Sequence, residues 1–190
     1  MARVQLVGKE EAPPEVKEVF QKIEDNGAKI VNLYKAVANS PKVVINFIRL
    51  GNSIIARMEL PPKQRELVIL RVARLNNCEY EWAGHTALAL EIGVSQQQIN
   101  AIADWQNSSE FSDEERAILQ YTDEVTQNVS VTDQTFSTLR KFLNEQAIVE
   151  VTLTAGFYGM LARVLVPLQV ELDEGTTSAT ELMGGRNQPK

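Results

Sequence analysis

Apolar residues recur three or four positions apart along most of this chain, and turn-forming residues interrupt the pattern at regular intervals. A period of 3.6 residues is typical of helices that bury one face. It predicts helices between Pro13-Pro14 and Asn26-Gly27, over residues 30–38 and 43–58, between Pro61-Pro62 and Asn76-Asn77, and over residues 79–92, 95–103, 114–128, 132–143 and 145–172.

Local end signals support these bounds. Ser95 with Gln98, and Ser112 with Glu115, have the spacing of capping boxes, and Gly93 suits a left-handed helix end. The polar stretch 104–111 is expected to be a loop. No segment alternates with period two for long enough to require a strand, so the sequence predicts an all-α fold of about eight or nine helices.

The length of 190 residues fits a single domain. We expect one helical domain over residues 1–172, with its core motif at 43–128. Residues 173–190 are rich in Gly, Thr, Ser and Asn and are predicted to form a disordered tail.

Charge excludes one class of partner. With 19 Lys and Arg against 25 Asp and Glu, the chain lacks the positive excess that nucleic-acid binding requires. The apolar stretch 151–170 carries Arg163, Pro167 and several hydroxyl groups, which favours a buried core helix over a membrane span. The first residues hold no secretory pattern, so we expect no membrane and a cytoplasmic location.

The only cysteine and the only histidine lie in one short segment, Cys78 to His85. Cys78, Glu81 and His85 share one face of the predicted helix. A carboxylate one turn from an imidazole can orient it for acid–base catalysis, and a thiol at a helix start can ionise more readily. The alternative is a surface ion pair of Glu81 with His85 and an inert, buried Cys78.

Glu66 precedes the apolar run 67–70 in the helix before this segment. It is either a solvated residue of the polar face or a carboxylate that points toward the Cys78 helix, since the short Asn76-Asn77 link makes the two helices pack together. A buried carboxylate needs a partner.

Residues 60–99, LPPKQRELVILRVARLNNCEYEWAGHTALALEIGVSQQQI, resemble the core of the carboxymuconolactone decarboxylase and alkylhydroperoxidase-D-like superfamily. Glu66 matches the helix glutamate of that group, Cys78 its first cysteine and His85 its histidine. Residues 31–43 and 156–172 also resemble family segments. The resemblance implies an all-α bundle, a small-molecule substrate and a homo-oligomer, in particular a trimer or hexamer, with no cofactor and no metal.

The chain departs from the peroxidase motif at Glu81, which replaces the second cysteine. An intramolecular disulfide cycle therefore cannot operate. The resemblance then favours the decarboxylase branch: a cofactor-independent enzyme on a small, lactone-type carboxylic acid from aromatic catabolism. It implies His85 as general acid and base, Glu81 as its orienting partner, Glu66 as a second carboxylate and Cys78 in the pocket lining.

Three questions stay open from the sequence. The carboxylate of such a substrate needs a cation, which Arg71, Arg74 or a neighbouring subunit could supply. A thiol-dependent peroxidase that uses Cys78 with an external thiol is the alternative on the same fold. A non-catalytic helical oligomer is the alternative outside enzymes.

Overall fold

The computed structural model describes residues 1–176, and every regular element in that range is a helix. This confirms the predicted all-α fold. The elements are α1 (Pro14–Asp25), α2 (Asn32–Val37), α3 (Pro41–Ala56), α4 (Pro62–Leu75), α5 (Glu79–Glu91), α6 (Gln96–Ala101), the 3₁₀ helix η1 (Ile102–Asn107), α7 (Asp113–Asn128), α8 (Asp133–Leu139) and α9 (Glu145–Leu168).

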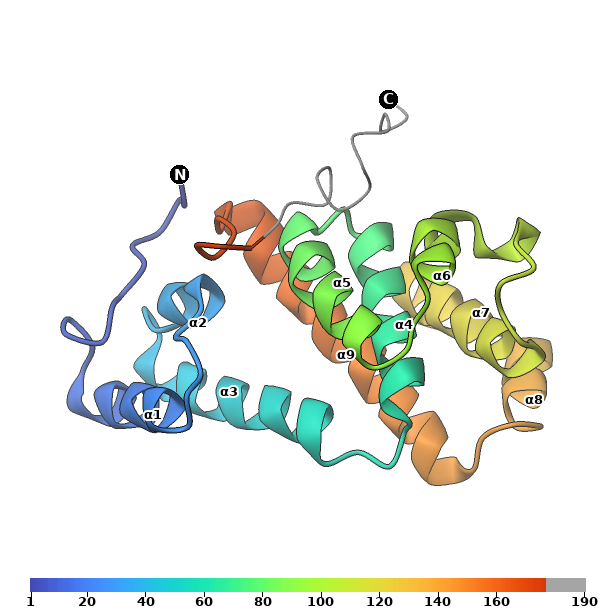
Figure 1. Ribbon diagram of the computed structural model, residues 1–190. Coiled ribbons are helices and arrows are strands. Elements are labelled where there is room, and N and C mark those ends of the chain that lie inside the picture. Colours follow the sequence, from blue (N-terminus) through green and yellow to red (C-terminus); the bar gives the residue numbers. More distant parts are fainter. Residues whose placement is uncertain (177–190) are drawn as a thin grey trace.

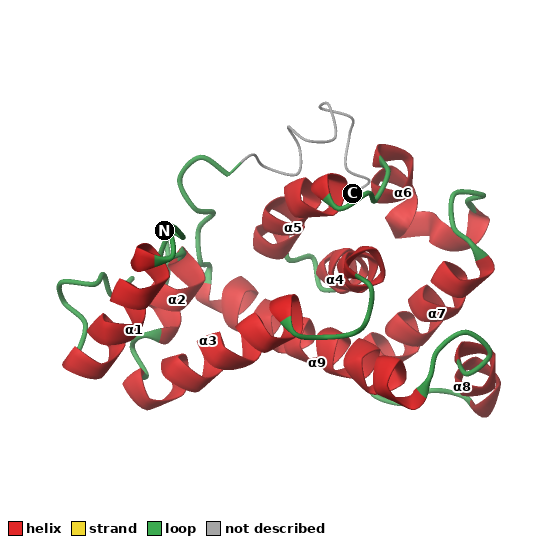
Figure 2. Ribbon diagram, turned by 60° about the horizontal axis from the view of Figure 1, so that its bottom comes forward, coloured by secondary structure: helices red, strands yellow, loops and turns green. Residues whose placement is uncertain are grey.

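Helices α4, α5 and α9 occupy the middle of the molecule (Figure 1). The N-terminal helices α1 to α3 lie on one side of them and α6 to α8 on the other, and the second view shows the same division (Figure 2). Helices α1 to α3 and helices α6 to α8 thus form separate walls around a shared centre.

Helix α4 is buried on all sides. Its residues 65–73 are all buried in succession. Val68, Ile69 and Val72 belong to the apolar cluster formed with α3 and α9, whereas Leu67 and Leu70 belong to a second cluster that includes Trp82 and Trp105. A helix with apolar neighbours on every face needs no polar stripe, which explains why charged residues on α4 must find partners inside the protein.

Helix α9 is long and apolar enough to cross a membrane by length and composition alone. Half of its most apolar window is buried inside the protein, where α9 packs on α3, α4 and α7. These contacts are those of a core helix, as its sequence predicts.

Both predicted capping boxes are present. The Ser95 hydroxyl accepts from the Gln98 N–H, the Ser112 hydroxyl accepts from the Glu115 N–H, and each partner side chain binds back to the cap residue. Reciprocal bonds of this kind satisfy amides that the first helical turn leaves free.

Several boundaries differ from the prediction. Residues 102–107 form the 3₁₀ helix η1 inside the expected loop, α8 ends at Leu139, and α9 ends at Leu168 instead of continuing to 172. The cause at α9 is Gln169, whose left-handed φ of 51° lets the Val170 N–H donate to the Leu165 carbonyl and close the helix.

The segment after α9 folds back onto α2. The Asp173 carboxylate accepts from the Asn32 N–H at 2.6 Å, so a residue that composition assigned to the tail is held against the first turn of α2. Residues 177–190 of the predicted disordered tail lie outside the described residues.

Candidate active site

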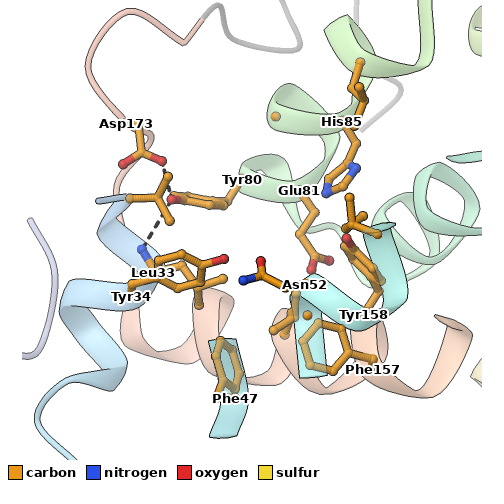
Figure 3. Close-up of a pocket in the computed structure, with 16 residues that line it drawn as sticks. Leu33, Tyr34, Phe47, Asn52, Tyr80, Glu81, His85, Phe157, Tyr158 and Asp173 are labelled. Atoms are coloured by element: carbon orange, nitrogen blue, oxygen red, sulfur yellow. Dashed lines mark hydrogen bonds between the residues drawn. The ribbon is translucent and has the colours of Figure 1, made fainter. Parts of the chain in front are cut away.

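A cavity of about 350 Å³ lies where α2, α3, α5 and α9 meet. Its polar residues include Glu81 and His85, which point inward from α5, and Asn52, which points inward from α3 (Figure 3). Aromatic rings form much of the remaining wall: Tyr34, Phe47, Tyr80, Phe157 and Tyr158. The cavity is thus apolar with a few convergent polar groups, as small-molecule sites usually are.

The link between α4 and α5 brings the two catalytic candidates together. Asn77 adopts a left-handed φ of 51°, and the Cys78 N–H donates to the Ala73 carbonyl at 2.9 Å. This closing pattern ends α4 and reverses the chain at once, because asparagine tolerates the left-handed region. Helix α5 therefore packs directly on α4 and places His85 above Glu66.

His85 is bound to Glu66. The imidazole Nδ1 lies 2.7 Å from Glu66 Oε2, and Glu66 itself is fully buried. Arg65 Nε lies 3.4 Å from the other oxygen, so a cation accompanies the carboxylate inside the protein. The inward orientation of Glu66, one of the two interpretations of the sequence, is the one that the structure shows.

The Tyr158 ring contacts the imidazole edge-on, with ring centres 5.0 Å apart and an interplanar angle of 87°. Burial raises the pKa of Tyr158 well above its usual value, and the charges of Glu66 and Glu81 add to this effect. Tyr158 therefore stays protonated at neutral pH. Together, the tyrosine ring and Glu66 fix the imidazole plane from two sides.

Glu81 is not the partner of His85, contrary to the sequence prediction. Glu81 lies one turn from His85 on α5, but the carboxylate that bonds the imidazole is Glu66 on α4. Glu81 is instead 3% exposed and lines the cavity, and neither of its oxygens has an N–H or O–H partner within residues 1–176. The weakly hydrogen-bonding thiol of Cys78 lies beside it. Burial raises the pKa of Glu81 to about 8, which the neighbouring Cys78 thiol opposes in part.

Cys78 does not line the cavity, which corrects a second prediction. It is 1% exposed and belongs to the apolar core cluster. Burial, followed by the charge of Glu81, raises the pKa of the thiol to about 12. The expected gain from the helix start is outweighed by burial, so the thiol is protonated at neutral pH.

The two arginines considered for a substrate carboxylate are engaged elsewhere. Arg71 forms a two-point ion pair with Asp123, at 2.5 and 2.8 Å, on the far side of α4. The Arg74 guanidinium lies 5.0 Å from the centre of the Trp82 ring. Among the described residues that line the cavity there is no lysine or arginine.

The sequence did not predict two of the cavity residues, Tyr80 and Asp173. Tyr80 lies next to the motif, but its role depends on Asp173, which accepts a hydrogen bond from the Tyr80 hydroxyl (Figure 3). Tyr80 also accepts from the Leu33 N–H at 3.3 Å. These two hydrogen bonds join α5, α2 and the segment after α9, and no local sequence pattern predicts them.

Gly84 lies at the exposed rim of the cavity. A Cβ atom built there would meet nothing within 4 Å, so the space that glycine leaves beside His85 is not required by close packing within the chain. Gly51, by contrast, would place a Cβ 3.3 Å from the Phe157 ring, and its absence lets α3 approach α9.

Comparison with known proteins agrees with this architecture. Residues 41–124 match the carboxymuconolactone decarboxylase family. Uncharacterized protein YnjA of Escherichia coli (strain K12) is 32% identical over 108 residues, which cover 56% of this chain and 59% of that protein. Uncharacterized protein YdfG of Bacillus subtilis (strain 168) is 30% identical over 112 residues, covering 54% of this chain and 76% of that protein. The chain belongs to the carboxymuconolactone decarboxylase family.

Solved structures show the same fold. An uncharacterized peroxidase-related protein from Ralstonia eutropha JMP134, with an alkylhydroperoxidase AhpD core, aligns with a TM-score of 0.80 and 15% identity over 91% of this chain and 93% of its own. The debrominase Bmp8 aligns with a TM-score of 0.74 and 19% identity over 90% and 92%. The same helical scaffold is thus shared with a protein named a debrominase and with one named peroxidase-related, and the fold alone does not choose a reaction for this chain.

Proposed function

We propose that this protein is an acid–base enzyme in which His85, oriented by Glu66, moves a proton to or from a carbon atom of a small, ring-bearing substrate. The observation that carries the proposal is the 2.7 Å contact between His85 Nδ1 and Glu66 Oε2 at the edge of the cavity. Such a pair fixes the imidazole in one orientation and one tautomer.

The direction of that hydrogen bond determines what the ring can do. As a carboxylate, Glu66 accepts a hydrogen bond from Nδ1–H, so the neutral imidazole keeps its proton on Nδ1. The lone pair on Nε2 is then free to take a proton from a bound molecule. The imidazolium formed can return that proton to another atom. Proton transfer by a positioned side chain typically contributes about 10²- to 10⁴-fold to a rate.

Decarboxylation of a lactone-type acid, the reaction that the sequence favours, belongs to this class. Loss of carbon dioxide leaves an electron pair on carbon, and the His85 imidazolium would supply the proton that this carbon takes up. The cavity offers no lysine or arginine within the described residues for the substrate carboxylate. A decarboxylase of this chain would need that cation from outside this lining, for example from a neighbouring subunit.

The thiol-dependent peroxidase has less support. It needs a thiolate within reach of the peroxide, and Cys78 is buried outside the cavity lining with its pKa raised to about 12. The absence of a second cysteine also requires an external resolving thiol.

Three assays on matched variants test the proposal: lactone decarboxylation by loss of ultraviolet absorbance, exchange of carbon-bound hydrogen with deuterium in ring ketones by NMR, and hydroperoxide consumption with an external thiol. We expect His85→Gln, which keeps a hydrogen-bond donor for Glu66, to lose about 10²-fold or more in turnover. Cys78→Ser should keep its turnover. Loss of turnover in Cys78→Ser with an active His85→Gln would contradict the proposal, and no turnover in any assay would favour the non-catalytic oligomer.

We further propose that a second copy of the chain covers the outer face of α9. Val149, Leu153 and Met160 share one side of the helix and are 55%, 49% and 40% exposed. An apolar stripe of this kind on a long helix is typical of a face that packs on another element. Light scattering should report an oligomer, for which the family resemblance implies a trimer or hexamer, and Leu153→Asp should shift it toward the 21.2 kDa monomer. A wild-type monomer at micromolar concentration would contradict this.

The cytoplasmic location stays a prediction.

A further inference from the structure

Glu81 is a buried cavity residue that the proposed mechanism does not use, and its carboxyl oxygens have no N–H or O–H partner within the described residues. Its polar neighbour is the thiol of Cys78, a weak hydrogen-bonding group. The Glu81 side chain is 3% exposed and points from α5 into the same space as the His85 ring (Figure 3). A buried carboxyl group without a strong hydrogen bond costs folding free energy. Such a group in a cavity is suited to a ligand that supplies the missing bond.

We propose that Glu81, in its neutral form, donates a hydrogen bond to the carbonyl oxygen of an uncharged, ring-bearing ketone or a lactone bound beside His85. This assignment rests on the proposed acid–base function and names its substrate class. Glu81 is then a second catalytic residue, with a role different from orienting the imidazole.

The surroundings of Glu81 favour an uncharged ligand. The described lining holds aromatic and aliphatic side chains and no lysine or arginine, so a substrate carboxylate would lose its hydration without gaining a cation. Burial raises the pKa of Glu81 to about 8, and the group is therefore mostly protonated at neutral pH and able to donate. The neutral amide of Asn52 points into the same space from α3 (Figure 3).

The chemistry is balanced without a further reactant. His85 Nε2 takes a proton from the carbon next to the carbonyl group, the C–H electron pair becomes the carbon–carbon π bond, and the carbonyl π pair moves to oxygen. The Glu81 O–H donates to that oxygen while its negative charge develops. His85 then returns the proton to the same carbon or to a conjugated one, and the carbonyl group re-forms. A neutral carboxylic acid in an apolar site is an effective donor to such an oxyanion.

Other titratable groups surround Glu81 and must be separated from it. Cys78 directly precedes α5 and His85 lies on it, and Glu66 and Arg65 reach the site from α4. Tyr34 on α2 and Tyr158 on α9 have pKa values raised by burial, and so has Tyr80, which bonds Asp173; the three hydroxyl groups stay protonated through pH 8. A variant that cannot titrate at position 81 isolates the contribution of Glu81.

Equilibrium binding tests the inference without turnover. Three probes of similar ring size are titrated into the full chain by calorimetry: acetophenone, benzoate and benzyltrimethylammonium. Acetophenone labelled with ¹³C at its carbonyl also reports the hydrogen bond through its infrared stretch. The proteins are wild type, Glu81→Gln, which keeps a donor but no charge, and Glu81→Leu, which has no donor. Glu150→Gln is the matched control, since Glu150 is buried but bonded to the Leu60 N–H outside the cavity.

We expect wild type to bind acetophenone at least about tenfold more tightly than benzoate. Glu81→Leu should bind acetophenone about tenfold more weakly than wild type, as removal of one hydrogen bond implies. The carbonyl stretch of bound acetophenone, which the hydrogen bond lowers in wild type, should not be lowered in Glu81→Leu. Glu81→Gln should keep binding within about threefold. Above pH 8, where Glu81 ionises, wild-type affinity for acetophenone should fall while that of Glu81→Gln does not.

Three results would overturn the inference: no acetophenone binding to wild type, unchanged affinity and carbonyl frequency in Glu81→Leu, or tighter binding of benzyltrimethylammonium than of acetophenone with a rise above pH 8. None of these depends on catalysis. An error in the proposed function would show separately, as undiminished turnover in His85→Gln.

Discussion

Two groups of buried polar and charged side chains lie on opposite sides of α4, and they differ in how completely their hydrogen-bonding atoms find partners. On one side, Arg71 pairs with both oxygens of Asp123 and also donates to the carbonyls of Ile102 and Ala103, while the Trp105 N–H donates to Asp123 at 3.1 Å. On the other side, His85 uses one ring nitrogen toward Glu66, and Glu81 has no N–H or O–H partner within residues 1–176, only the thiol of Cys78 beside it.

The difference indicates two purposes. The Arg71–Asp123 network joins α4, η1 and α7, and it leaves little for a ligand to add, so it stabilises the fold. The His85–Glu66–Glu81 group borders a cavity and keeps a ring nitrogen and a carboxyl group available, so it is suited to chemistry. Incomplete satisfaction of buried polar groups is costly, and a ligand site is where that cost has a function.

Breaking the satisfied network should give the largest effect. Asp123→Ala leaves the Arg71 guanidinium and the Trp105 N–H without their carboxylate. We expect a loss of about 3–5 kcal/mol in the free energy of unfolding, measured by urea titration, because a buried charge then lacks its counterion. The matched control is Glu18→Ala, which breaks the exposed pair with Lys22 and should change the free energy of unfolding far less, because solvent screens that pair. Equal effects at the two positions would contradict the structural role of Asp123.

Breaking the catalytic pair should affect turnover more than stability. His85→Gln and Glu66→Gln should each lower turnover, and the double variant should be hardly worse than His85→Gln alone, since residues that act as a unit give non-additive losses. The single loss of about 10²-fold corresponds to about 2.7 kcal/mol. Losses that multiply in the double variant would mean that Glu66 and His85 act independently.

Glu81→Gln should give the smallest change per pH unit, visible in the pH dependence of stability. The folded protein holds a proton on Glu81 up to about pH 8, whereas the unfolded chain releases it near 4.5. Between these values the folded state binds more protons, so wild-type stability falls as pH rises, by at most about 1.4 kcal/mol per pH unit from this group. We expect the free energy of unfolding of Glu81→Gln, measured by urea titration, to fall less steeply with pH than that of wild type between pH 5 and 8. An identical slope in both proteins would show that Glu81 ionises normally in the folded state.

Local signals predicted the fold well. Capping boxes at Ser95 and Ser112, the Asn76-Asn77 link and the 3.6-residue period each depend on neighbours in sequence, and the structure contains them as expected. The errors lie at helix ends such as Gln169, where a single backbone conformation decides between continuing and stopping.

Of the four site residues predicted from the sequence, Glu81 and His85 line the cavity and Glu66 bonds His85, whereas Cys78 lies in the apolar core. Spacing placed Cys78, Glu81 and His85 on one face and left Glu66 open, but it could not show which carboxylate reaches the imidazole. That choice depends on how deeply α5 packs on α4, a tertiary property. The burial of Cys78 and the contact from Asp173 to Tyr80 likewise depend on residues far apart in the chain.

The central claim is that Glu66 orients His85 with Nε2 free toward the cavity, and ¹⁵N NMR of the imidazole tests it most directly. The chain has a single histidine, so one pair of ring nitrogen signals reports the site without ambiguity. Our account predicts that the neutral ring carries its proton on Nδ1 in wild type and that Glu66→Gln weakens this preference. A ring protonated on Nε2, or a tautomer mixture unchanged by Glu66→Gln, would contradict it.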